Sequence, residues 1–277
     1  MIVENMNTYL KNIFKGTSAK LLQNIINDPD SKNSLSFAHF VNQLLTKHRF
    51  FCQHEFFDIF DSYCKDFAIS LGIEKSLYRA RRMSLDEYDK RKEELQCDTE
   101  SQDTFSGFAK KESFVPPSNK IAASRANNNG IPCLYAAESM KTAISEVRPY
   151  KGTYVSVAKI KIKRPLKLFN LCIPPDDFNL PGFCYMKKYP TWYHSIAIMF
   201  SIPYEKSNKN EYLVTQCISE YIRLSGNFDG ISYDSSLNDG GINYAIFDCA
   251  HEDYSLCEPI SSKVCSITKI DVEYDDK

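Results

Sequence analysis

The chain has 277 residues, of which 43% are hydrophobic and 25% are charged, and its formal net charge is −1 at pH 7. These values are typical of a globular protein with one large domain, or with one domain and a smaller appendage. They provide no positive field that would attract nucleic acid or an anionic membrane, so we expect neither as a partner.

The ten cysteines are scattered along the chain, and no two of them form a C-x-x-C pair. This spacing argues against a zinc ribbon and against a thioredoxin-like redox site. The first 15 residues lack the apolar stretch of a secretion signal. The longest apolar run, at 196–202, is much shorter than the ~20 residues that a membrane span needs. We therefore expect a cytoplasmic protein with reduced thiols.

The first 75 residues show the apolar spacing of helices. Between residues 36 and 45 the apolar side chains recur at i, i+3, i+4, i+7 and i+8, and the aromatic side chains from Phe56 to Phe67 repeat that pattern. Gly72 is a plausible end for the last of these helices. We predict an all-α N-terminal domain over 1–75, whose aromatic stripe packs in a core.

Strands and helices mix after residue 75 without a regular βαβ alternation, which predicts an α+β domain over 76–277. We expect an exposed charged helix within 84–103 and an irregular loop over 106–129. The other predicted helices cover 140–147, with Ser139 as the N-cap, and 212–224. Strands are predicted at 77–81, 133–137, 154–162, 166–171, 230–233 and 244–247.

A group of polar residues in this domain could hold a phosphorylated nucleotide and attack a bond to its sugar. Arg79 and Arg125 offer planar cations for a pyrophosphate, and Tyr135 offers an aromatic wall. Glu146 offers a carboxylate that could stabilise an oxocarbenium-like sugar. Taken alone, each residue also has an ordinary interpretation, since Glu146 could pair with Arg148 and the arginines could lie on the surface.

Four ordered motifs strengthen the functional interpretation. They are Tyr78-Arg79-Ala80-Arg81; Ser124-Arg125-Ala126-Asn127 with Gly130-Ile131-Pro132 and Leu134-Tyr135; Thr142-Ala143-Ile144-Ser145-Glu146; and Asp229-Gly230-Ile231-Ser232-Tyr233-Asp234-Ser235-Ser236 with Gly241-Ile242-Asn243. In this order the motifs resemble the RES family of NAD-degrading toxins, over residues 49–248. Ser124 stands where that family has a glycine, a departure that concerns the backbone shape of the loop.

The resemblance implies an ADP-ribosyltransferase-like fold with a split antiparallel sheet around a nucleotide cleft. It implies that Glu146, Arg79 and Tyr135 are the catalytic residues. The implied substrate-binding residues are Arg125, Asn127, Ser235, Ser236 and Asn243. Which of the two serines contacts the substrate stays open at this point.

The same resemblance implies that NAD⁺ is the substrate, cleaved at the nicotinamide–ribose bond by water or by inorganic phosphate as a co-substrate. Transfer of ADP-ribose to a protein is the alternative reaction. We expect no metal and no separate cofactor. A toxin or defence effector that depletes NAD⁺ would be the biological role, and a protein antitoxin is an expected partner.

A different class of function is suggested by Arg49 and His54. Their R-x4-H spacing resembles the motif of HEPN-type ribonucleases, in which the arginine steadies a phosphate and the histidine moves a proton. Phe50 follows the arginine here, among further phenylalanines. We therefore prefer a capping or docking role for residues 1–75 and keep the ribonuclease as the second alternative.

Overall fold

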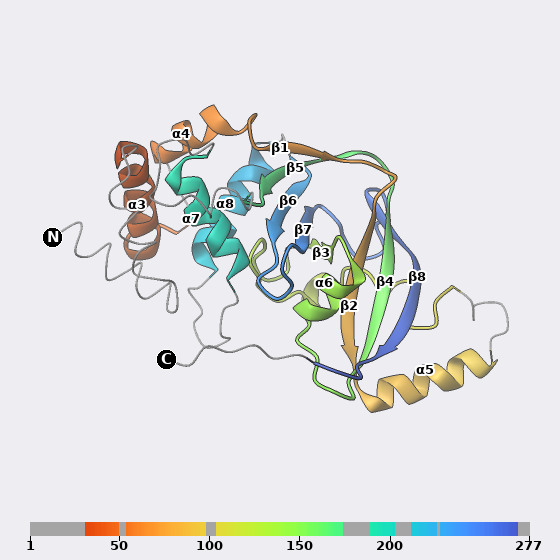
Figure 1. Cartoon of the computed structure of the whole chain (residues 1–277). Helices are drawn as coiled ribbons and strands as arrows, with labels where there is room; N and C mark the ends of the chain where they lie inside the picture. The colour runs from red at the N-terminus through yellow and green to blue at the C-terminus, as the bar shows by residue number, and fades with distance from the viewer. Residues whose placement is uncertain are drawn as a thin grey trace, which may run out of the picture.

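The computed structural model describes residues 31–49, 54–97, 104–173, 189–202, 212–225 and 228–270. Within these ranges the chain forms one eight-stranded sheet with helices on it (Figure 1). The strands are β1 (Ala68–Leu71), β2 (Ser76–Met83), β3 (Cys133–Ala137), β4 (Tyr154–Ile162), β5 (Leu166–Leu171), β6 (Gly230–Asp234), β7 (Ile242–Phe247) and β8 (Cys257–Ser266). The helices are α3 (Ser31–Thr46), α4 (Phe56–Tyr63), α5 (Leu85–Cys97), α6 (Met140–Glu146), α7 (Thr191–Ser201) and α8 (Leu213–Leu224), with the 3-10 turn η1 (Ser118–Lys120).

The sheet has the order β1-β5-β6-β7-β3-β2-β4-β8. All neighbouring strands are antiparallel except β5 and β6, which are parallel. Strands β2 and β3 meet at one residue pair only, Tyr78 with Ala137, whereas β2 pairs with β4 along its whole length. This narrow junction splits the sheet into two parts. The α+β class is confirmed, and the sheet is mixed because β5 and β6 run parallel. Helix α6 follows β3 and packs over the junction, against β2, β3, β4 and β7.

Each face of the sheet has its own apolar core. Helices α3, α4, α7 and α8 lie together on one side of the molecule (Figure 1), where they bury the first core against β5, β6 and β7. Trp192 of α7 is fully buried in it, edge-on to Phe56 of α4 and tilted against Phe60. The second core, on the opposite face, includes Leu77, Ile160 and the loop residue Phe114. None of the helices within the described ranges is long and apolar enough to cross a membrane.

The N-terminal segment is less purely helical than its sequence predicted. Helix α4 ends at Tyr63, and residues 68–71 form strand β1, which pairs with β5. The prediction of a continuous helical segment up to Gly72 is therefore wrong, because a four-residue strand with an exposed middle carries too little alternation to stand out from the preceding aromatic stripe. The boundary at residue 75 stays a prediction, although the strand before it belongs to the sheet of the residues after it.

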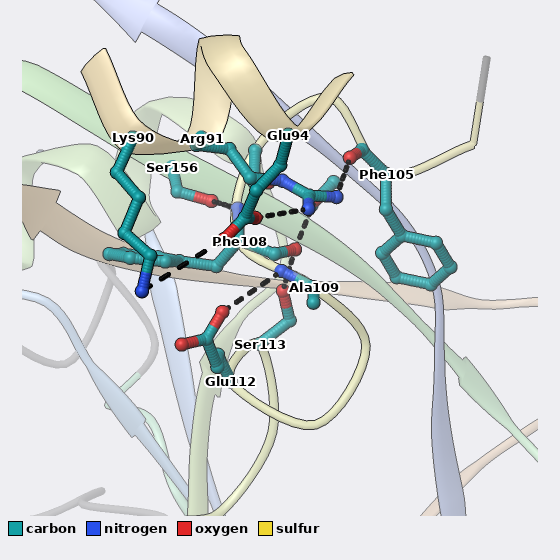
Figure 2. A network of polar contacts seen from close by, with 11 residues as sticks. Lys90, Arg91, Glu94, Phe105, Phe108, Ala109, Glu112, Ser113 and Ser156 are labelled. Carbon is teal, nitrogen blue, oxygen red and sulfur yellow. Dashed lines mark hydrogen bonds and ion pairs between the residues drawn. The ribbon is translucent and has the colours of Figure 1, made fainter. Parts of the chain in front are cut away.

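Helix α5 lies at the lower edge of the molecule in Figure 1, and the ring of its Tyr88 stacks on Tyr154 of β4 with the centroids 4.1 Å apart. Ser84 and Glu87 form a reciprocal cap, in which each side chain accepts the backbone N–H of the other residue. Arg91 joins the helix to the loop that follows it by donating to the carbonyls of Phe105 and Gly107, both at 2.7 Å (Figure 2). The other charged side chains of α5 lie at the surface, which agrees with the exposed helix predicted there.

Candidate functional site

Helix α6 places Glu146 at its last position. The helix begins after Ser139, whose hydroxyl accepts the backbone N–H of Thr142 at 3.1 Å, as predicted for an N-cap. Two turns later the helix ends at Glu146. The predicted strand–turn–helix order therefore brings the carboxylate to the junction of the split sheet.

The carboxylate of Glu146 is held by two neutral donors. The Ser235 hydroxyl and the Asn243 side-chain amide both donate to Oε1 at 2.7 Å. Ser235 and Asn243 are themselves buried. Among the described residues Glu146 has no ion pair, so the pairing with Arg148 does not form, and Oε2 has no hydrogen-bond partner. One oxygen is thus fixed while the other stays available.

The two neighbouring serines differ in position. Ser235 is buried and also accepts the backbone N–H of Leu237 at 3.2 Å. Ser236 is exposed, and its hydroxyl makes no hydrogen bond within the described ranges. Of the two, Ser235 is therefore the residue that the structure brings to Glu146.

Arg79 lies at the junction between β2 and β3. Its Nη1 donates to the backbone carbonyl of Tyr135 at 2.9 Å, next to the single residue pair that joins these strands. Although part of the side chain is exposed, its Nε is buried and has no acceptor in the described part of the chain. Burial, and then the nearby charge of Arg81, lower the pKa of Arg79 to about 10. No described carboxylate pairs with this guanidinium.

Tyr135 and Asn127 connect strand β3 to the loop before it. The Tyr135 hydroxyl accepts the backbone N–H of Ala126 at 2.9 Å and donates to Oδ1 of Asn127 at 2.7 Å. Burial raises the pKa of Tyr135. The Asn127 amide donates in turn to the carbonyls of Ala122 and Asn128. The polar atoms of both residues thus organise the loop, and their predicted contacts with a substrate remain predictions.

Arg125 lies on the same loop and reaches the C-terminal end of α7. Its Nη1 donates to the carbonyls of Phe200 and, at 2.6 Å, Ile202. A cation is favourable at this end of a helix, because the last carbonyls lack intrahelical donors and carry partial negative charge. The structure thus gives Arg125 a contact with α7 that the sequence did not predict, and its role in phosphate binding stays a prediction.

Tyr233 is a site residue that the sequence did not single out. It pairs directly with Asn243, so the two side chains lie on the same face of the sheet. Burial raises the pKa of Tyr233, while the charge of Arg125 acts to lower it and that of Glu146 to raise it. The phenol therefore lies within electrostatic reach of both residues. Its position two residues before Ser235, on the same face of a strand, was the available signal.

Two residues of the last motif, Asp229 and Gly230, have structural roles in the fold. Asp229 forms a bidentate ion pair with Arg164, at 3.0 and 2.6 Å, and accepts the backbone N–H of Lys167. Gly230 lies against β7, where an added Cβ would come within 2.3 Å of the Ala245 carbonyl oxygen. These residues fix the start of β6, and hence the position of Ser235 at its end.

The ribonuclease alternative needs Arg49 and His54 to act together on one phosphate, and the structure gives His54 other contacts. His54 Nδ1 accepts the backbone N–H of Phe56 at 3.0 Å, and its Nε2 lies 3.1 Å from Nδ1 of His39. Arg49 is exposed, and no hydrogen bond joins it to His54 in the described ranges. Residues 50–53 lie outside the described residues. One nitrogen of His54 thus contacts the start of α4, and the other contacts His39 of α3.

The side chains of the described ranges include no group of three or more His, Cys, Asp or Glu residues placed to hold a metal ion. Cys64, Cys133, Cys172, Cys249, Cys257 and Cys265 are free thiols. The site consists of two parts: a carboxylate held by hydroxyl and amide donors, and guanidinium groups at the junction and the loop. The predicted Glu146, Ser235 and Asn243 are brought into contact, as are Arg79, Tyr135 and Asn127.

Comparison with known proteins identifies a family and a similar solved structure. Residues 99–269, more than half of the chain, match the family model described as RES domain. The match includes every predicted site residue except Arg79, which precedes it. A chain from the crystal structure of the M. tuberculosis MbcT–MbcA toxin–antitoxin complex is similar at 9% identity, with a TM-score of 0.38 and coverage of 74% of this chain and 91% of that one. No curated protein matches the sequence.

Proposed function

The chain belongs to the RES domain family, and on that premise we propose that it cleaves NAD⁺ at the nicotinamide–ribose bond. The observation that supports this most directly is the state of Glu146. Its carboxylate is fixed through one oxygen by Ser235 and Asn243, and has no cationic partner among the described residues. Such a group keeps its negative charge available for a substrate.

The chemistry of this bond suits a single carboxylate. Nicotinamide carries a positive charge in NAD⁺ and leaves as a neutral molecule, taking the bonding electron pair, so that no strong general acid is needed. The ribose then becomes oxocarbenium-like, and a preorganised negative charge lowers the free energy of that transition state. We assign this stabilisation to Glu146, with Ser235 and Asn243 holding it in place.

The pyrophosphate of NAD⁺ would lie near Arg79. A buried guanidinium without a carboxylate partner is unfavourable in the free protein, and a bound phosphate would supply the missing acceptor. Arg125 is proposed as the second phosphate contact and Tyr135 as the wall for the nicotinamide, with Asn127 shaping the loop between them. In this arrangement Arg79 and Arg125 meet the phosphates in the ground state and in the transition state alike, so that their loss would weaken both binding and rate.

The group that accepts the ribose decides the class of reaction. With water, NAD⁺ gives ADP-ribose, nicotinamide and a proton; with inorganic phosphate, it gives nicotinamide and an ADP-ribose phosphate ester. A nucleophilic protein side chain would make the enzyme an ADP-ribosyltransferase, which is the alternative proposal. Any of the three would suit a toxin that acts on NAD⁺, and a protein antitoxin that restrains it is part of the proposal.

The test is to incubate the purified chain with NAD⁺, with and without inorganic phosphate, and to identify the products chromatographically. We expect free nicotinamide, formed about 100-fold or more slowly by Glu146→Gln, which keeps the side-chain shape and removes the charge. Glu138→Gln, an exposed carboxylate in the turn before α6, is the matched control and should retain activity. Intact NAD⁺ in every condition, including with added protein acceptors, would refute the proposal.

A further inference from the structure

The loop between β6 and β7, residues 235–241, lies against α6 at a second place besides Glu146. Asn238 Nδ2 donates to the Thr142 hydroxyl at 2.9 Å, and that hydroxyl lies 2.8 Å from the Ser139 hydroxyl. Thr142 is fully buried. Its hydroxyl therefore depends on these two partners, because a buried polar group without hydrogen bonds is costly.

The loop and the helix approach each other so closely that only glycine fits at one position. A Cβ added to Gly241 would lie 2.6 Å from the Thr142 Oγ1 and 2.8 Å from the Asn238 Nδ2. Gly241 also donates its N–H to the Asn238 carbonyl and accepts the N–H of Ser235 with its own carbonyl. The loop is thus a closed turn that presents Asn238 to the helix.

Thr142 and Glu146 are four residues apart and lie on the same face of α6. Thr142 meets the tip of the loop through Asn238, and Glu146 meets its base through Ser235 and Asn243. Two points of contact fix both the position and the rotation of a helix as short as α6, which has seven residues. If the Thr142 contact were lost, α6 would still pack on the sheet, but only the contacts of Glu146 itself would join it to the β6–β7 loop and to the Asn243 side chain.

We propose that Thr142 and Asn238 are positioning residues, which clamp α6 onto the β6–β7 loop so that the Glu146 carboxylate is held against Ser235 and Asn243. This inference rests on the proposed function of Glu146. Neither residue needs to contact the substrate. The clamp explains why Thr142 and Gly241 occur in their motifs: Thr142 provides the hydroxyl, and Gly241 lets the loop approach it.

The kinetic test is Asn238→Ala, with Asp239→Ala as the control from the exposed part of the same loop. Loss of one hydrogen bond of this kind should lower kcat about tenfold, while KM for NAD⁺ changes little because the phosphate contacts are intact. The decisive arm combines Asn238→Ala with Glu146→Gln. A positioning residue has no further effect once the carboxylate is gone, whereas an equal loss in both backgrounds would overturn the proposal.

A structural arm keeps the clamp testable if the protein proves inactive on NAD⁺. Hydrogen exchange of the α6 amides should become faster in Asn238→Ala and in Thr142→Val, and stay near the wild-type rate in Thr142→Ser, which keeps the hydroxyl. Faster exchange in these variants, together with a wild type that does not cleave NAD⁺, would reject the proposed reaction and retain the clamp. Unchanged exchange, or faster exchange in an enzyme whose kcat is unchanged, would reject the clamp.

Discussion

Glu146 and the two serines near it show how one residue step decides a role. Ser235 directly follows strand β6, with its hydroxyl 2.7 Å from the Glu146 Oε1, whereas Ser236 is exposed at the surface. We expect Ser235→Ala to lower kcat for NAD⁺ cleavage by about tenfold, because the carboxylate loses one of two donors. Ser236→Ala is the matched comparison and should retain wild-type kinetics. The reverse order of the two effects would show that the exposed serine contacts the substrate.

Arg79 carries the clearest unmet interaction at the same scale. Its pKa is lowered to about 10 because burial disfavours the charged form. At neutral pH the charged guanidinium therefore lowers the folding stability of the protein without ligand. A ligand that supplies negative charge should therefore stabilise the fold, by about 2.7 kcal/mol when NAD⁺ is present at 100 times its Kd. Thermal unfolding with increasing NAD⁺ measures this. In Arg79→Ala the rise in Tm should be largely lost, and an unchanged rise would exclude Arg79 from the binding site.

Some helices and strands were predicted accurately from the sequence, and others were missed. Strands β4 and β5 match the predicted ranges residue for residue, because alternating or continuous apolar residues end at clear polar boundaries. Helix α7 was not predicted, since it is apolar on all sides and so lacks the one-sided pattern of a surface helix. Strand β8 was missed because Pro259 interrupts a mostly polar run.

For the site, features set by neighbouring residues could be predicted from the sequence, and contacts between distant residues could not. The end of α6 and its N-cap are local, and the sequence predicted both. The contacts of Glu146 with Ser235 and Asn243 join residues 89 and 97 positions apart, so only the fold could show them. The motifs predicted which residues take part, and the topology supplied which of them meet.

The contact between α3 and α4 makes an element-scale prediction about pH. Burial, followed by the charge of His39, lowers the pKa of His54 below its usual 6.5, although Glu55 opposes this shift. A histidine with a lowered pKa binds its proton less tightly when folded, so stability is present above about pH 6.5 and falls as the pH drops through that value. We expect the Tm of the wild type to decrease between pH 7 and 5.

His54→Asn should remove part of that pH dependence, because its side-chain oxygen can still accept the Phe56 N–H but does not titrate. His48→Asn is the control and should retain the wild-type profile, because His48 is exposed and its described hydrogen bond is made by its backbone N–H. Equal profiles in all three proteins would assign the pH dependence to other groups.

At the scale of the whole molecule, the N-terminal helices and the sheet share one core. Phe60 of α4 stacks on Phe169 of β5 with the ring centroids 5.0 Å apart, and its centroid lies 5.6 Å from that of Trp192 of α7. Phe57 of α4 stacks on Tyr221 of α8, whose hydroxyl donates to Asp61 at 2.7 Å. Contacts of this kind resemble the interior of one domain more than a joint between two. We therefore expect the described helices and the sheet to unfold together.

Trp192 makes this expectation measurable, because it is the one tryptophan of the chain and lies in the shared core. In a denaturant titration, its fluorescence should report the same midpoint as far-UV circular dichroism, which follows the helices and strands of the whole chain together. Phe60→Ala should lower the free energy of unfolding by about 3–5 kcal/mol and move both signals together. If the helices formed an independent domain, the substitution would shift the fluorescence transition and leave the unfolding of the sheet, and with it NAD⁺ cleavage, in place.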